Sequence, residues 1–424
     1  MNRVVSRPAP LPPASILDLL SPGAAARVSR RLLAYVHVPF CSAKCHFCDW
    51  VVGYDKSELL DTRRLRDSYV RALGEQIRAY GPTLGELGYI ATNVYWGGGT
   101  PTRLTPEQLA TIDDTLRDVL DLSHVQEYTA ECSPETVTAD HLDVWLARGL
   151  NRVSVGVQSF DDTVLRRMGR PHSAQVAREC IELFRCVGID NFNIDLIVGF
   201  PDQRVDAVLD SVQRAIDLGV PHISVYLFRE FSTDLVAVRQ VRAGWRAQVS
   251  REERAWVYRS VKERLEQAGY HEYMVGYFAR EPRFQFDGEK YYFGMEGDYF
   301  GFGAGASSTI GRCGLRSGEA SRYGSAQVLA FVQQPSDMLA APLAALPDEV
   351  YIESYFKAFA TREGVRFGKW LDQFGFSFAS FRSARPGIQR WFADLERSGA
   401  RFVETTEGIA LSTDTWLDTM MWRR

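Results

Sequence analysis

The chain has 424 residues, of which 46% are hydrophobic and 24% are charged, a composition typical of a globular protein with a large buried core. Its formal net charge of -4 gives no basic field for a phosphate backbone, so we expect no nucleic-acid partner. No stretch reaches the roughly 18 uninterrupted apolar residues that span a bilayer, and residues 1–20 lack the apolar part of a signal peptide, so we expect a cytoplasmic protein with no membrane partner.

The chain order of apolar patterns predicts an α/β fold. Residues 1–30, rich in Pro, Ala and Ser, form an expected N-terminal arm, after which strand-like runs alternate with segments of helical period. The strand-like runs cover residues 33–40, 89–99, 127–132, 152–160, 192–201 and 222–228. The helical segments cover residues 68–81, 105–120, 139–149, 173–188, 205–219 and 251–269. Such strand–helix units predict a parallel sheet, here a partial (β/α)6 barrel of the TIM type whose chemistry lies at the C-terminal ends of its strands.

The pattern changes after the last unit. An aromatic and glycine-rich extension begins at about residue 271 and closes the expected core, residues 31–312. Residues 313–424 are expected to form a smaller accessory domain, mostly helical and ending in a hairpin, similar to a winged helix.

Three of the seven cysteines follow the first strand with the spacing C-x3-C-x2-C, at Cys41, Cys45 and Cys48. The odd count and the scatter of the other four favour a reducing compartment over a disulfide framework. A zinc site would need a fourth ligand such as His37 or His46, and buried free thiols are the plainest alternative. Thiolates at these spacings let one loop surround an iron–sulfur cube, leaving its fourth iron open.

Other polar residues cluster at the same end of the predicted barrel. Gly97 to Thr100 follow the second strand, Glu131 ends the third, Gln158 ends the fourth and Asp195 lies in the fifth. The glycines allow the backbone to approach a ligand closely, with N–H groups expected to be free for a carboxylate or to face an amino group.

The cysteine spacing resembles the signature of the radical S-adenosylmethionine (SAM) superfamily. Five blocks in order resemble its HemN-like branch, named for oxygen-independent coproporphyrinogen III oxidase: YVHVPFCSAKCHFC, YWGGGTPTRL, RVSVGVQSFDDTVLRRMGRPHS, NIDLIVGFPDQ and HISVYLF. The resemblance covers about residues 33–312. It implies a 4Fe-4S cluster on Cys41, Cys45 and Cys48, SAM at the open iron, and an electron donor such as flavodoxin or ferredoxin.

The resemblance also implies the residues around the cofactor. Glu131 and Asp195 suit the ammonium and ribose hydroxyls of SAM, Arg170 suits its carboxylate, and Tyr35 lies beside the sulfonium, where a strand residue packed in the core is the alternative. The full cofactor-binding set is Tyr35, Phe47, Gly98, Gly99, Thr100, Glu131, Gln158, Arg170 and Asp195.

Three kinds of family member remain possible. The coproporphyrinogen oxidases carry a further cysteine where this chain has Trp50. Heme-trafficking relatives share Asp49, but usually carry a His-Asn pair where this chain reads FDGEKYYFG, and no histidine follows residue 271. Both departures favour the third reading, a class C radical SAM methyltransferase that uses two SAM molecules, with Phe228 and Arg229 beside the second.

The methyltransferase reading implies an aromatic heterocycle as methyl acceptor, such as a thiazole or indole in a peptide or a small natural product. A base must remove a proton from the methylated carbon, and Tyr277, Glu281 and Glu289 are the candidates by their position in the extension. Tyr277, Phe278, Tyr291 and Tyr292 could stack a flat substrate, with core packing as the alternative.

Overall fold

The computed structural model describes most of the core and the tail. The described residues are 30–48, 53–54, 62–228, 236–245, 250–292, 297–310, 313–317, 325–342, 358–359, 361, 363–374, 376–397 and 399–412. Residues 1–29 of the predicted arm, together with Asp49, Trp50 and Arg229, lie outside them.

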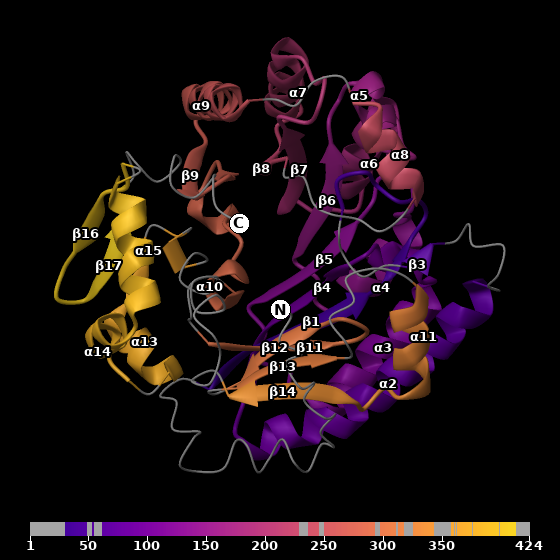
Figure 1. Cartoon of the computed structure of the whole chain (residues 1–424). Helices are drawn as coiled ribbons and strands as arrows, with labels where there is room; N and C mark the ends of the chain where they lie inside the picture. The colour runs from indigo at the N-terminus through magenta and orange to yellow at the C-terminus, as the bar shows by residue number, and fades with distance from the viewer. Residues whose placement is uncertain are drawn as a thin grey trace.

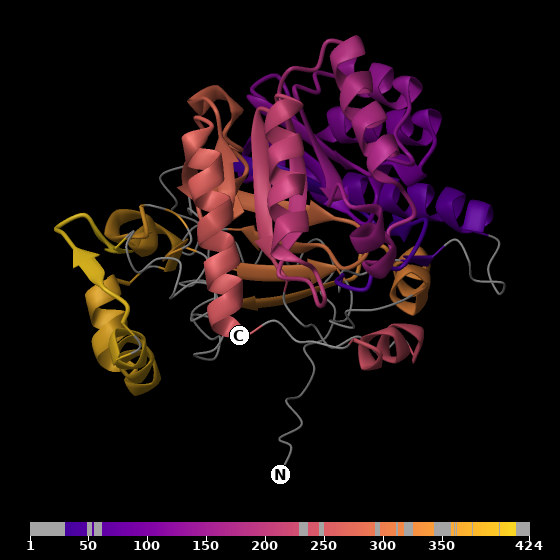
Figure 2. The ribbon, with the colours of Figure 1, turned by 90° about the horizontal axis from the view of Figure 1, so that it is seen from above.

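Six parallel strands form the centre of the main sheet in the order β1-β4-β5-β6-β7-β8. They are β1 (Arg31–Val38), β4 (Ile90–Gly98), β5 (Glu127–Cys132), β6 (Arg152–Gln158), β7 (Phe192–Val198) and β8 (His222–Leu227). The helices that follow them are α2 (Thr62–Glu86), α3 (Pro106–Val119), α4 (Ala139–Leu146), α5 (Asp162–Arg167), α6 (Ala174–Cys186), α7 (Val205–Asp217), α8 (Val236–Ala243) and α9 (Arg251–Gln267). Apart from α8, these helices cover the outer side of the curved sheet (Figures 1 and 2), so the predicted partial (β/α)6 barrel is confirmed.

The two faces of this sheet differ in polarity. In β5, Tyr128 and Ala130 belong to the apolar core, whereas Thr129 and Glu131 alternate with them and face inward. The same alternation places Asp195 of β7 on the inner face, and Asn193 donates a hydrogen bond to it on that face. TIM barrels usually fill their interior with branched aliphatic side chains, so a polar inner face indicates a ligand site.

The aromatic and glycine-rich extension adds strands to both edges of the sheet, a result that the sequence patterns do not predict. At the β8 edge lie β10 (Tyr277–Ala279) and β9 (His271–Met274), both antiparallel. At the β1 edge lie β11 (Asp298–Phe302), parallel to β1, and then an antiparallel series of β12 (Ser307–Ile310), β13 (Cys313–Ser317) and β14 (Met338–Pro342). The short elements η2 (Pro282–Phe284), α10 (Glu289–Tyr292) and α11 (Ser325–Gln333) connect or flank these strands.

The tail forms a separate unit with its own apolar core around Phe359, Trp370 and Phe392. Its elements are α13 (Phe367–Phe374), α14 (Phe378–Ala384), α15 (Pro386–Arg397), and the small sheet of β15 (Val365–Arg366), β16 (Phe402–Glu404) and β17 (Gly408–Leu411). A bridge between Met274 and Thr361 joins this unit to the end of β9. The predicted domain start at residue 313 is too early, because β13 and β14 pair with the main sheet.

Candidate functional site

The three clustered cysteines lie on the loop that follows β1. Cys41 ends β2 (Phe40–Cys41), which pairs with β3 (Gly53–Tyr54), and Cys45 and Cys48 follow. All three are partly buried and free, so none forms a disulfide. The hydroxyl of Thr100, directly before η1 (Pro101–Arg103), donates to Cys41 Sγ at 3.7 Å, and the Arg170 guanidinium donates to Cys45 Sγ at 3.3 Å.

The chemistry of these thiols fits an iron–sulfur cluster. Burial, with the neighbouring Cys48 and Cys45, raises the pKa of the Cys41 thiol to about 12. The three cysteines can therefore lose their protons together only when positive charge lies close by, and the iron of a cluster would supply it. The Arg170 guanidinium adds a further positive charge and a hydrogen bond to Cys45 Sγ. Within the described part of the chain, no three His, Cys, Asp or Glu side chains converge on one metal ion. A cube does not require convergence, because each thiolate binds a different iron.

The two histidines considered as zinc ligands make other contacts. His37 is buried, and its Nδ1 lies 2.9 Å from the Tyr35 hydroxyl. His46 Nδ1 lies 2.7 Å from the Arg167 carbonyl oxygen. These contacts tie both rings to the protein and give no support to the zinc alternative.

The glycine run after β4 holds the cysteine loop. Gly99 N–H donates to the Val38 carbonyl at 2.9 Å, Thr100 N–H donates to the Phe40 carbonyl at 2.8 Å, and Gly98 N–H donates to Glu131 Oε2 at 3.1 Å. The prediction that these N–H groups are free for a ligand is therefore wrong. Glycine is required for close packing instead, since a Cβ on Gly99 would lie 2.7 Å from the Val38 carbonyl oxygen.

Two carboxyl groups face the barrel interior below the loop. Tyr95 donates its hydroxyl to Glu131 Oε1 at 2.5 Å, and Asn193 donates to Asp195 Oδ1 at 2.8 Å. Burial raises the pKa of Glu131 to about 7, an effect to which the charge of Asp195 contributes, and burial raises the pKa of Asp195 to about 6. Both groups can ionise fully when a cationic ligand enters, which suits the ammonium group of SAM.

Gln158 and Arg170 complete the polar wall. Gln158 has a φ of 70°, a conformation uncommon outside glycine, and its buried Oε1 has no partner among the described residues. A ligand donor would satisfy that oxygen. Arg170 also donates to the Gly156 carbonyl at 2.7 Å, so it lies between the cysteine loop and β6.

Aromatic rings line the same interior. The Tyr35 ring lies 6.0 Å from the ring of Tyr95, whose hydroxyl is bound to Glu131. The predicted position of Tyr35 beside the sulfonium of SAM stays a prediction. Tyr226 of β8 is 41% exposed, although its hydroxyl lies 2.9 Å from that of Tyr277 and its pKa is raised by burial and by Asp195. The sequence patterns missed Tyr226 because it reads as an ordinary strand residue.

Of the two residues predicted beside a second SAM, Phe228 lies in an apolar cluster near the cysteine loop. Phe228 is 6% exposed and packs with Phe200, at a ring distance of 4.8 Å. Phe47 and Trp245 pack against the same cluster. Phe228 and Phe47 therefore support the loop by packing, and Arg229 lies outside the described residues.

Of the three candidate bases, Tyr277 and Glu289 lie near each other, whereas Glu281 lies apart. Tyr277 lies in the barrel interior, with its pKa raised by burial and by the nearby Glu289. Glu289 is buried in α10. Glu281 is mostly exposed and pairs with Arg283 at 3.0 Å, and Arg283 pairs with Asp190, which precedes β7 at the opposite end of the barrel. Glu281 is therefore wrongly placed for chemistry at the cluster.

The proposed aromatic stacking residues are mainly core residues. Phe278 is 0% exposed and Tyr291 is 3% exposed, so core packing accounts for both. The Tyr292 side chain lies outside the described part of the structure.

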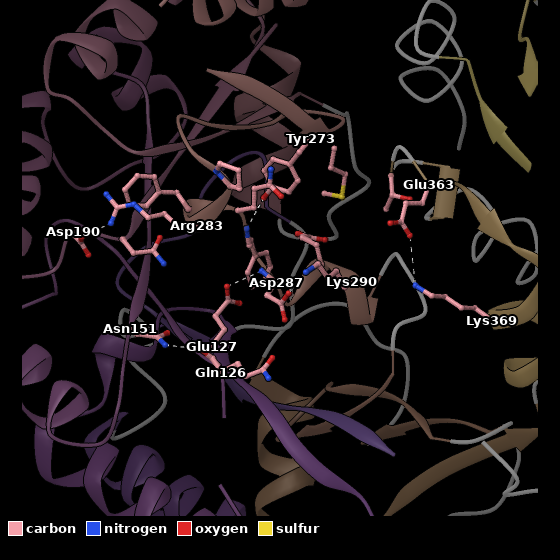
Figure 3. A pocket seen from close by; sticks show the side chains of 18 residues that line it. Gln126, Glu127, Asn151, Asp190, Tyr273, Arg283, Asp287, Lys290, Glu363 and Lys369 are labelled. Carbon is pink, nitrogen blue, oxygen red and sulfur yellow. Dashed lines mark hydrogen bonds and ion pairs between the residues drawn. The ribbon is translucent and has the colours of Figure 1, made fainter. Parts of the chain in front are cut away.

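A cavity of about 700 Å3 lies at the N-terminal ends of the strands, away from the cysteines. Its walls include Glu127, Tyr273 and Asp287 of the main unit and Lys369 of the tail unit (Figure 3). The carboxylate of Glu127 accepts the N–H groups of Asp287 and Gly288 at 2.9 and 3.1 Å, which fixes the extension under the barrel.

Comparison with known proteins identifies the family. The model of the radical SAM superfamily matches residues 35–215. The heme chaperone HemW of Lactococcus lactis is 32% identical over 278 residues, which cover 65% of this chain and 69% of that protein. The chain belongs to the HemN/HemW-like branch of the radical SAM superfamily.

Two further comparisons extend the result. The oxygen-independent coproporphyrinogen III oxidase of Bradyrhizobium diazoefficiens is 33% identical over 192 residues, covering 45% of this chain and 41% of that protein. The solved structure of Escherichia coli coproporphyrinogen III oxidase (HemN) has a TM-score of 0.76 at 23% identity and covers 99% of this chain and 94% of that one. This likeness shows the fold alone.

The relatives overturn the methyltransferase prediction. They are named as heme chaperones and coproporphyrinogen oxidases, so a class C methyltransferase acting on a thiazole or indole is not supported. Membership of the radical SAM superfamily implies a 4Fe-4S cluster and SAM, and a second SAM stays a prediction, as does the electron donor. None of the helices described here is long and apolar enough to cross a membrane.

Proposed function

We propose that this chain is a heme-binding radical SAM protein that acts as a heme chaperone. The observation that carries the proposal is the likeness to the HemW proteins of Lactococcus lactis and Escherichia coli, which extends over 69% and 70% of their lengths at 32% and 33% identity. The oxidases of Bradyrhizobium diazoefficiens and Salmonella typhimurium are covered over only 41% and 53% of theirs.

The cofactors are assigned to the interior already described. Cys41, Cys45 and Cys48 hold the cluster, which supplies the electron for reductive cleavage of SAM when it is bound and reduced. Glu131 and Asp195 receive the ammonium and ribose groups, and the unpartnered Gln158 Oε1 accepts a hydrogen bond from the ligand.

The oxidase alternative is less favoured by the sequence next to the cluster. The residue two positions after Cys48 is Trp50, where the oxidases carry a cysteine. The resemblance to the oxidases therefore fails at this position.

The contacts of the histidine rings show which histidines could bind heme iron. The rings of His141, His172 and His222 are buried with both nitrogens close to protein partners. His37 and His46 belong to the cysteine loop and its supporting strand.

Two histidines remain exposed, His124 and His271. His124 lies beside Asp121 in the turn after α3. His271 begins β9, the last strand of the main sheet, which joins the tail unit through the bridge of Met274. We assign His271 as the residue that binds heme iron, since neutral imidazole binds heme iron and the His271 side chain is exposed.

Anaerobic heme titration of the cluster-loaded protein tests the proposal. Wild-type protein and the control variant His124→Ala should bind one heme with a Soret band of a histidine complex, whereas His271→Ala should lose at least tenfold in affinity or change its band. Absence of saturable heme binding in the wild type contradicts the chaperone function. Equal binding by His271→Ala contradicts only the ligand assignment.

A further inference from the structure

Glu135 connects the cysteine loop to the rim of the barrel, in a position that no sequence motif marks. It lies three residues after β5, and its side chain is 18% exposed. The Ser42 hydroxyl donates to Glu135 Oε1 at 2.8 Å, and the Ser133 hydroxyl donates to Oε2 at 2.5 Å. Ser42 directly follows the first cluster cysteine, so one carboxylate oxygen is bound to the loop and the other to the barrel.

The same carboxylate is linked to a second cluster cysteine. Ser133 Oγ accepts a hydrogen bond from the Arg170 guanidinium at 2.8 Å, and that guanidinium donates to Cys45 Sγ at 3.3 Å. The path from Glu135 through Ser133 and Arg170 to Cys45 therefore consists of three polar contacts. Arg170 is half-buried, and an anion close by offsets the cost of removing its charge from water.

A buried histidine lies against the other side of Glu135. His172 Nδ1 lies 3.3 Å from Glu135 Oε2, and His172 Nε2 lies 3.1 Å from the Val157 carbonyl oxygen of β6. Burial opposes ionisation, but the His172 contact, the charge of Arg170 and the Ser133 hydrogen bond together lower the pKa of Glu135 to about 2. The carboxylate is thus ionised and held at each oxygen throughout the neutral pH range.

We infer that Glu135 is a positioning residue for the iron–sulfur cluster: it anchors the loop at Ser42 and orients Arg170 against Cys45, so it sets both cluster retention and reduction potential. Hydrogen bonds to cluster sulfurs and nearby charges are the levers by which a protein tunes such potentials. This inference rests on the cluster site within the proposed function and not on heme binding, so loss of heme binding with an intact cluster leaves it standing.

The isosteric variant Glu135→Gln separates charge from shape. The amide can still accept from Ser42, so the cluster should be retained, but the loss of a negative charge should stabilise the reduced cluster and shift its midpoint potential to a more positive value. Glu135→Ala removes every contact, and we expect it to retain less than half of the wild-type iron and labile sulfide after anaerobic reconstitution. Ser42→Ala should give a smaller loss, since it removes only the loop contact.

Glu272→Gln is the matched control. Glu272 is 2% exposed and is bound by Tyr258, by Lys262 at 2.6 Å and by the Gly276 N–H at 3.0 Å, within the β9 region and not beside the cysteine loop. Its substitution should lower the melting temperature and leave the iron content, electron paramagnetic resonance spectrum and midpoint potential of the cluster unchanged.

Iron and sulfide analysis, the spectrum of the reduced cluster and a potentiometric titration of all five proteins decide the matter. The expected pattern is a potential shift in Glu135→Gln, cluster loss in Glu135→Ala and neither in Glu272→Gln. Wild-type potential and spectrum in Glu135→Gln would overturn the inference, as would an equal shift in Glu272→Gln. Should Glu135→Ala fail to fold, Glu135→Gln and Ser42→Ala still decide it.

Discussion

Glu131→Gln is expected to stabilise the cofactor-free protein at alkaline pH and to weaken its binding of SAM. Burial, with the charge of Asp195, raises the pKa of Glu131 from 4.5 to about 7. At about 1.4 kcal/mol per pH unit, ionising this group in the folded state costs about 3 kcal/mol. The Glu131 residue is only partly buried, so solvent screens its charge and we expect a cost of about 1–2 kcal/mol in practice.

The sign of the effect follows from proton binding. Between pH 4.5 and about 7 the folded state holds a proton on Glu131 that the unfolded state releases, so wild-type stability falls as the pH rises through this window. The neutral amide removes that penalty. It can accept the Gly98 N–H and donate to the Tyr95 hydroxyl, so the local hydrogen bonds survive.

Urea unfolding of the cluster-free protein without SAM measures this difference. Glu131→Gln should match the wild type at pH 4.5 and exceed its free energy of unfolding by about 1–2 kcal/mol at pH 8. The exposed Glu86→Gln is the control and should change nothing at either pH. A variant that is equally destabilised at both pH values would refute the account of Glu131 as a buried group ready to ionise.

The affinity of the cluster-loaded protein for SAM should rise with pH, whereas the stability of the cofactor-free protein falls. Because the ammonium of SAM attracts the ionised carboxylates, wild-type affinity should rise from pH 6 to pH 8, across the pKa of about 7 at Glu131 and about 6 at Asp195. Glu131→Gln should bind more weakly and with a flatter pH profile. Unchanged affinity in the variant would place SAM elsewhere.

Three further substitutions probe the site. Cys45→Ser should bind less than half of the wild-type iron and lose SAM cleavage, as measured by iron analysis and by release of deoxyadenosine, and full activity would exclude Cys45 as a ligand. Gly98→Ala should lower the free energy of unfolding by about 3 kcal/mol, because the φ of Gly98 is 102° and a Cβ would lie 2.4 Å from the His37 ring. The control is Gly149→Ala, where φ is 91° and a Cβ would meet nothing within 4 Å. In the same urea experiment this control should lose only about 1 kcal/mol. Phe228→Ala should cost about 3 kcal/mol by emptying a buried site beside the loop, and a cost under 0.5 kcal/mol would show that the apolar cluster is not packed as described.

The repeated strand–helix units could be predicted from the sequence because their signals are local. Each apolar run and each helical period is contained in a few residues, and capping residues such as Thr105 and Ser173 mark where helices begin. The gathering of Cys41, Cys45 and Cys48 on one loop was equally predictable, since their spacing is short, and their role as cluster ligands stays a prediction.

The edge strands and the supporting contacts could not be predicted in this way. β11 pairs in parallel with β1, from which it is separated by more than half of the chain, and no periodicity encodes that partner. Glu135 acquires its role from Ser42 and His172, both distant in sequence, so it reads as an ordinary loop carboxylate. The glycine N–H groups were wrongly predicted to be free, because the carbonyl partners at Val38 and Phe40 emerge only when β1 and β4 pair.

The prediction of a methyltransferase reaction was wrong for a different reason. Trp50 and the FDGEKYYFG stretch were read as departures that disfavoured both tetrapyrrole functions, yet the relatives are heme chaperones and coproporphyrinogen oxidases. Residues 286–292 of this stretch lie at the base of the barrel, where the Phe286 ring packs 5.3 Å from the Tyr95 ring. The missing His-Asn pair thus reflects a different packing at the base of the barrel and was no evidence for a methyl acceptor.

The central claim is best tested by incubating the cluster-loaded protein anaerobically with SAM and reductant, once with heme and once with coproporphyrinogen III, and analysing both samples by mass spectrometry and absorbance. The chaperone account predicts a stable complex with one heme per chain, heme recovered unmodified, and no decarboxylated product from coproporphyrinogen III. Decarboxylated product without heme binding would contradict it and identify the chain as an oxidase.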